Sequence, residues 1–111
     1  MRLITFLGTG NYAETCYTFD GQECQTRYVA AALATFLQAD EITVLATEQA
    51  YTSHAQGLTD ELVHLQLPHP TIRRIPSGGN TEELWQQFSI ISDAVTEGNI
   101  THVSFDITHG F

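Results

Sequence analysis

The sequence contains no lysine and is poor in basic residues, with four arginines against thirteen aspartates and glutamates. Its net charge of −9 argues against duplex DNA or RNA as a partner, because such binding depends on Lys and Arg neutralising many phosphates. A small phosphorylated ligand is not excluded, because backbone N–H groups at the start of a helix can hold phosphate without a basic patch.

Cysteine is scarce, and Cys16 and Cys24 have neither zinc-site spacing nor the pattern of a disulfide framework. They flank Asp20-Gly21, a strong signal for a two-residue hairpin turn. In that hairpin Cys16 lies opposite Gln25, on the other face of the sheet from Cys24. A disulfide is therefore not expected, and the sequence favours a reducing, cytoplasmic compartment.

Long hydrophobic runs are absent as well. The apolar stretch within residues 1–10 is too short for a signal peptide or a membrane span, so the sequence predicts no membrane partner. No repeat, linker or low-complexity tract interrupts the chain, and 111 residues suffice for one core but not for two domains.

Apolar runs predict the strands of one sheet. They fall at 3–7 and 42–46, with a short strand at 71–75 and a last strand at 102–108. Because helical patterns separate these strands, right-handed crossovers and a parallel sheet are expected. The predicted fold class is α/β, a Rossmann-like open parallel sheet with a β-hairpin inserted after the first strand.

Helical spacing predicts three helices. They are expected from an N-cap at Thr26 through residue 37, over most of 47–63 with a break at Gly57, and from a cap at Asn80 to a stop at Gly98. The predicted core is Ile4, Phe6, Val29, Leu33, Phe36, Val44, Leu84, Phe88, Ile91, Val103 and Phe105.

The ends of the first and last strands form the candidate site. In an open α/β sheet ligands collect at the carboxyl ends of strands where the strand order reverses. If the first three strands step outward, the fourth returns beside the first, and two polar loops then face each other. The candidate ligand-binding residues are Gly8, Thr9, Gly10, Asn11, Tyr12, Asp106, Thr108, His109 and Gly110, with Ser77 and Gly78 as further candidates after the third strand.

Residue chemistry suggests roles for the first of these loops. The glycines let the backbone approach a ligand closely, Thr9 and Asn11 offer neutral hydrogen-bonding groups, and Tyr12 offers a stacking face. A tight turn that merely reverses the chain is the alternative. The glycine pattern is not read as the dinucleotide fingerprint, because a hairpin is expected where that fingerprint requires a helix, so no nicotinamide cofactor is expected.

The remaining candidates carry their own alternatives. Asp106 suits a catalytic acid, a metal ligand or a structural cap for the next helix. Ser77 and Gly78 suit a turn followed by a helix cap equally well. His109 is the histidine expected in the pocket, and no Ser/His/Asp or Cys/His arrangement stands out. The sequence predicts no metal site and no cofactor.

Four sequence blocks together are similar to a known family. They are FLGTGNY, YTFDGQE with TRY, PSGGNTEELW and FDITHGF, in this order from end to end of the chain. They resemble the CRISPR-associated Rossmann-fold (CARF) family, in the branch found in type III CRISPR ancillary ribonucleases. The resemblance implies a cytoplasmic homodimer that binds a cyclic oligoadenylate across its two-fold axis, with cyclic tetra-adenylate the favoured ring.

The resemblance implies a sensor domain of an antiviral defence system and leaves two alternatives open. Some family members cleave the ring without metal, when a ribose 2′-OH attacks the adjacent phosphate. A stand-alone ring nuclease is therefore the second reading, with Thr9 and His109 as candidate catalytic residues. A generic nucleotide-binding α/β domain is the third.

The chain departs from the family pattern at its last residue. The family motif continues with a basic residue after the position of Phe111, where this sequence ends. We therefore expect residues 1–111 to form a single CARF-like domain truncated at its carboxyl-terminal end. No effector nuclease domain is present in this sequence, and without the cation we expect weaker ligand binding and little or no ring cleavage.

Overall fold

The computed structural model describes residues 1–10, 12–98 and 102–108. The strands are β1 (Arg2–Leu7), β2 (Thr15–Phe19), β3 (Gln22–Thr26), β4 (Glu41–Ala46), β5 (Thr71–Arg74) and β6 (Val103–Asp106). The helices are α1 (Val29–Leu37), α2 (Glu48–His64) and α3 (Thr81–Thr96). A parallel sheet with the order β5-β4-β1-β6 and a separate antiparallel hairpin, β2-β3, give the Rossmann-like α/β fold that the sequence predicts.

The central strand of the sheet is β1, which pairs with β4 on one side and β6 on the other. Leu3 lies opposite Ile42 of β4, and Thr5 lies opposite Asp106 of β6. The predicted adjacency of the first and last sheet strands is thus confirmed. The strand order reverses between them, so the loops after β1 and β6 leave the same edge of the sheet from neighbouring strands.

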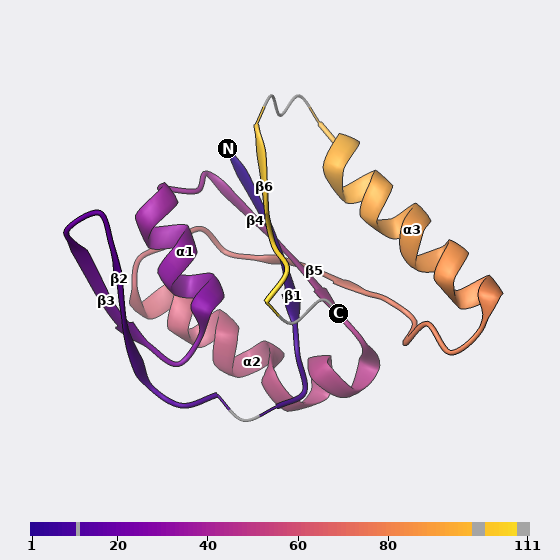
Figure 1. Cartoon of the computed structure of the whole chain (residues 1–111), viewed down its shortest axis with the longest axis horizontal. Helices are drawn as coiled ribbons and strands as arrows, with labels where there is room; N and C mark the ends of the chain where they lie inside the picture. Colours follow the sequence, from indigo (N-terminus) through magenta and orange to yellow (C-terminus); the bar gives the residue numbers. More distant parts are fainter. Residues whose placement is uncertain (11, 99–101, 109–111) are drawn as a thin grey trace.

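Helices cover both faces of the sheet, which explains why β1 is apolar along nearly its whole length. Figure 1 shows α1 and α2 on one side of the strands, the hairpin beyond α1, and α3 alone on the other side. Leu3 and Leu7 face the α1 and α2 side, whereas Ile4 and Phe6 face α3. This alternation follows from the two-residue period of a strand.

The hairpin has the predicted register. Cys16 lies opposite Gln25, and the turn residues Asp20 and Gly21 have φ of 49° and 78°, the left-handed pair that a tight two-residue turn requires. Both cysteines are free thiols. The hairpin packs on α1 through a stacked pair of rings, Phe19 and Phe36, with centroids 5.8 Å apart.

The predicted core is only partly correct. Ile4 and Val44 are fully buried, but Leu84, Phe88 and Phe105 are exposed. The remaining predicted core residues are half-buried, namely Phe6, Val29, Leu33, Phe36, Ile91 and Val103. On α1 the buried face consists instead of Ala30, Ala31, Ala32 and Ala34, whose small side chains bring the helix close to the sheet.

Two predictions about helix boundaries are wrong. Helix α2 runs unbroken through Gly57. This glycine does not end the helix; its missing side chain leaves room for the hydroxyl of Tyr28. Thr26 ends β3 and does not cap α1; the N-cap is Tyr28, which makes no side-chain capping bond. The cap at Asn80 is confirmed, since its side chain accepts a hydrogen bond from the N–H of Glu83 at 2.9 Å.

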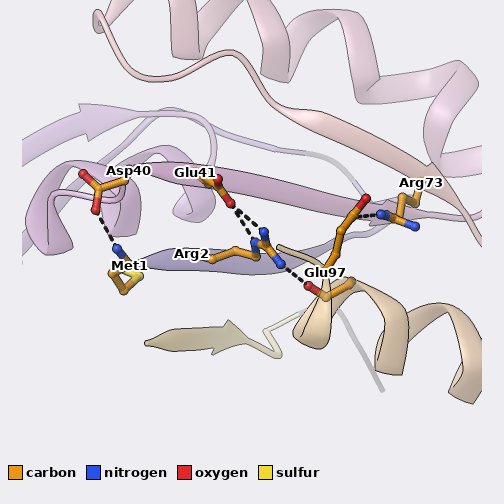
Figure 2. Close-up of polar contacts among 7 residues, drawn as sticks. Met1, Arg2, Asp40, Glu41, Arg73 and Glu97 are labelled. Atoms are coloured by element: carbon orange, nitrogen blue, oxygen red, sulfur yellow. Dashed lines mark hydrogen bonds and ion pairs between the residues drawn. The ribbon is translucent and has the colours of Figure 1, made fainter. Parts of the chain in front are cut away.

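A buried arginine joins three elements at the opposite edge of the sheet from the candidate site. Figure 2 shows Arg2 directed toward Glu41 of β4, with Glu97 beyond the end of α3 paired to Arg73. The Arg2 guanidinium lies 2.8 Å from the Glu41 carboxylate and donates to the carbonyl of Ala94 at 2.7 Å. It thereby fixes the last turn of α3, where helix carbonyls lack partners within the helix.

The helices of the described residues are all too short or too polar to cross a lipid bilayer.

Candidate functional site

The loop after β1 is held by one tyrosine. The hydroxyl of Tyr12 accepts a hydrogen bond from the N–H of Gly8 at 2.8 Å and lies 3.3 Å from the Gly8 carbonyl, to which it donates. Thr9 and Gly10 lie between these anchored ends and are exposed to solvent. The loop therefore presents an uncovered backbone and the Thr9 side chain above the end of β1.

Tyr12 is itself supported by two other rings. Its ring lies 4.9 Å from that of Tyr28, before α1, and 4.7 Å from that of His54 of α2, the latter edge to face. Arg27 donates to the Tyr12 carbonyl at 3.1 Å. The predicted stacking residue thus has a structural role, since it connects the loop to both helices on this face of the sheet. No sequence pattern around a single loop tyrosine would have indicated its contacts with Gly8, Tyr28 and His54.

Burial raises the pKa of Tyr12 above its ordinary value of 10.0, and the hydrogen bond from Gly8 only partly opposes this shift. The neutral phenol therefore persists in the folded chain at a pH where the unfolded chain has begun to ionise. Its contribution to stability is present below pH 10.0 and is lost as the pH rises through the folded pKa.

The Tyr12→Phe variant should be less stable than the wild type by about 1 kcal/mol near neutral pH, because the N–H of Gly8 loses its partner. Above pH 10.0 the difference should shrink, because the wild-type phenol becomes costly to keep neutral. Urea unfolding at neutral and alkaline pH measures both effects. A constant difference across this range would contradict the assigned role.

The loop after β6 is organised by a buried carboxylate. Asp106 is only 4% exposed and accepts hydrogen bonds from the hydroxyl of Thr5 at 2.8 Å and from the backbone and hydroxyl of Thr108 at 3.0 and 2.6 Å. The bonds to Thr108 form an Asx turn, the local structure in which an aspartate caps its own chain two residues later. Asp106 is therefore a structural cap for the loop that carries Thr108.

The bond between Thr5 and Asp106 also ties the two candidate loops to each other. Thr5 belongs to β1 and lies opposite Asp106 in the register, three residues before the start of the Gly8 loop. Thr9 and Thr108, both exposed, thus follow neighbouring parallel strands. The arrangement offers two hydroxyls and an open glycine backbone to a ligand lying over the strand ends.

Ser77 and Gly78 lie farther along the same edge. They follow β5, and β4 separates β5 from β1. Gly78 has a φ of 80°, and a Cβ there would lie 3.3 Å from the side chain of Leu84 of α3. This position fits the turn and helix cap that the sequence offered as the alternative. Asn11, His109 and Gly110, the other candidates, fall outside the described residues.

A cation that belongs to neither candidate loop lies at this edge. Arg74 ends β5, stacks 4.0 Å from the ring centre of Tyr51 and pairs with Glu48 of α2 at 3.2 Å. The hydroxyl of Tyr51 and the charge of Glu48 raise its pKa. Two arginines therefore lie near the candidate site, Arg74 beyond β4 and Arg27 behind Tyr12, and both already have partners.

A ligand of nucleotide size must bind over the loops and not beneath them. The apolar cavity under the β1 loop, lined by Leu7, Tyr12, Tyr28 and Leu58 among others, has a volume of about 10 Å³, room for one water molecule. Within the described part of the chain, no three His, Cys, Asp or Glu side chains gather as metal ligands would.

A scan of the chain against protein-family models finds no match, and a search of curated proteins finds no significant match either.

Proposed function

We propose that the chain is a cyclic oligoadenylate-binding sensor domain, with the ligand lying over the loops that follow β1 and β6. The observation that carries the proposal is the juxtaposition of these loops on neighbouring strands, at the reversal of strand order where open α/β sheets bind ligands. The resemblance of FLGTGNY and FDITHGF to the CARF family supplies the ligand class, because these two blocks contain the two loops.

The chemistry of the loops suits a ribose-phosphate ring. Gly10 has no neighbouring heavy atom within 4 Å of the position of a Cβ, so a flat ligand can approach the backbone there. Thr9 is exposed and able to bond a ribose hydroxyl or a phosphate oxygen, and the exposed hydroxyl of Thr108, which donates to Asp106, can accept from a ribose hydroxyl. A ring with internal symmetry fits a two-fold site, so the proposal includes a homodimer in which each copy contributes one pair of loops.

The negative charge of the chain limits which interactions can provide the binding affinity. With a net charge of −9, long-range attraction cannot draw in a polyphosphate, so affinity must come from short contacts with backbone N–H and hydroxyl groups. We therefore expect the affinity to depend less on salt concentration than that of a site built from lysines.

Thr9→Val and Thr108→Val should each weaken binding of cyclic tetra-adenylate by roughly 1–2 kcal/mol, about 5- to 30-fold, because ligand groups lose a partner on burial. Isothermal titration calorimetry on the whole chain measures this, with cyclic hexa-adenylate as a second ligand. Thr52→Val, on the exposed side of α2, is the matched control and should bind like the wild type.

Two results would overturn the proposal. One is the absence of binding of either ring to the wild type, and the other is unchanged affinity in both loop variants. Chromatography of the recovered ligand adds a further test, because an intact ring is expected from a sensor. Recovery of linear product would reassign the chain to the ring nucleases.

A further inference from the structure

Helix α3 presents an unusual exposed surface, which we call the α3 patch and define as Leu84, Trp85 and Phe88. Their exposed fractions are 55%, 68% and 64%. Trp85 and Phe88 contact each other edge to face, with centroids 6.1 Å apart, so the two rings form one continuous surface. Single exposed apolar side chains are ordinary, but adjacent large ones on one helix indicate an interaction site.

The patch follows from how α3 is attached to the sheet. Its second half packs on the sheet through Ala94, Ile90, Ile91 and Val95, which contact Ile4 and Leu45 or their neighbours. The first half carries the patch, and Figure 1 shows this amino-terminal end of α3 pointing away from the strands. The patch is therefore separate from the core and from the loops after β1 and β6, although Leu84 adjoins the turn at Gly78.

The charges on α3 itself are all of one sign. Helix α3 contains Glu82, Glu83 and Asp93 and no Lys, Arg or His. Glu82 precedes Trp85 by three residues, a spacing that places the two side chains next to each other on a helix. Among the ion pairs formed by the described residues, none involves Glu82 or Glu83. The patch is thus an apolar surface on the acidic first turns of α3, with the carboxylate of Glu82 beside Trp85.

We propose that the α3 patch binds a segment of another protein that presents an apolar stripe flanked by Lys or Arg. The apolar stripe would cover Leu84 and Phe88, and the cations would pair with the carboxylates. An exposed tryptophan is also the best aromatic partner for a guanidinium or ammonium group. Tryptophan and arginine are enriched among the residues that dominate binding energy in protein interfaces.

Charge complementarity argues against two other occupants, a second copy of the chain and a membrane. A second copy that docked through the same patch would bring two acidic α3 helices face to face, and like charges across an interface are costly. An anionic membrane surface would be repelled by the same carboxylates, because interfacial helices bind such surfaces through Lys and Arg. A basic and apolar polypeptide has neither problem. This inference does not depend on the proposed function, since it uses a different surface.

The test uses the single tryptophan of the chain as its reporter. An amphipathic helical peptide with leucines on one face and lysines on the other, the Leu-Lys peptide, is titrated into the whole chain. The control is the Leu-Glu peptide, in which glutamates replace the lysines. The Leu-Lys peptide should shift the emission of Trp85 to shorter wavelength with saturation, because the indole leaves water. The Leu-Glu peptide should give no shift.

Variants separate the patch from general attraction between opposite charges. Phe88→Asp should weaken binding of the Leu-Lys peptide at least tenfold although it adds a negative charge, and Glu82→Lys should weaken it as well. Ser53→Asp places the same added charge on exposed α2 and should bind at least as tightly as the wild type. Circular dichroism checks that each variant remains folded.

Several outcomes would overturn the proposal. They are no emission shift with the Leu-Lys peptide, equal binding by Phe88→Asp and Ser53→Asp, and a shift with phosphatidylserine vesicles in place of the peptide. Dimerisation in sedimentation experiments that Phe88→Asp abolishes would also overturn it and assign the patch to a second copy.

Discussion

Replacing Asp106 with Ala should lower the free energy of unfolding by about 2–4 kcal/mol, because hydrogen bonds to a charged acceptor contribute about 1.5–3 kcal/mol each. The larger part of the loss should come from Thr5, whose side chain is 1% exposed and would have no water to replace its acceptor. Thr108 is exposed and can bond to water, but its loop should lose the Asx turn. Urea unfolding measures the stability.

The Asp106→Ala variant should also lose affinity for cyclic tetra-adenylate, because Thr108 would no longer be held beside the β1 loop. Asp93→Ala, which removes an exposed carboxylate from α3, should change stability by less than about 0.5 kcal/mol and serves as the control. Combining Asp106→Ala with Thr5→Val should restore part of the stability, since removing both partners leaves no buried group unpaired. No recovery in the double variant would contradict the assigned contact.

Gly57→Ala should destabilise the chain by about 1–3 kcal/mol, the usual cost of overfilling a packed site. The opposite sign is expected of a glycine in an ordinary helix interior, where alanine is favoured by about 0.5–1 kcal/mol. A Cβ at Gly57 would lie 2.5 Å from the hydroxyl oxygen of Tyr28, and Tyr28 is only 3% exposed, so its ring has little room to move.

The Tyr28→Phe background provides the matched control for this prediction. Without the hydroxyl oxygen, Gly57→Ala should become neutral or stabilising, so the effect of one substitution changes sign with the presence of a single atom. Chemical unfolding of the four proteins in this cycle measures the coupling between the two sites. Equal effects of Gly57→Ala in both backgrounds would show that the contact does not limit the packing of α2.

The parts of the fold that followed from the sequence are those determined by local chemistry and by simple rules of topology. The register of the hairpin depends on the two turn residues Asp20 and Gly21, because a two-residue turn determines which residues of the two strands lie opposite each other. The pairing of β1 with β6 follows from a rule of topology. After the earlier strands have been added outward on one side of β1, the last strand is added on its other side.

Other features depend on distances between elements, which periodicity does not contain. The spacing of Leu84, Phe88, Ile91 and Val95 identifies one helical stripe, but it does not say that the sheet meets only the second half of α3. In α1, hydrophobicity favours the large residues as core, whereas close packing selects the alanines. The wrong prediction at Gly57 has the same cause. A glycine that breaks a helix and a glycine that makes room for a neighbouring side chain cannot be told apart in the sequence.

The candidate site divides in the same way. The structural cap that the sequence offered as one alternative for Asp106 is found as an Asx turn, in which an aspartate bonds to the backbone two residues later. The hydrogen bond between Tyr12 and Gly8 and the ring contact between Tyr12 and His54 join a loop to itself and to a helix. No local sequence pattern indicates these contacts.

The pairing of β1 with β6 has a consequence for how the molecule folds and opens. Thr5 and Asp106 are 101 residues apart, so their contact closes nearly the whole chain and is expected to form after the local elements, which cost less loop entropy. Strand β6 is short, contacts the described sheet through β1 alone, and has one buried residue among four. It is therefore the part of the sheet expected to detach first in local unfolding events. Detachment separates the two loops without melting the rest, so any ligand held by both loops stabilises β6 selectively, and slower amide hydrogen exchange there reports occupancy of the site.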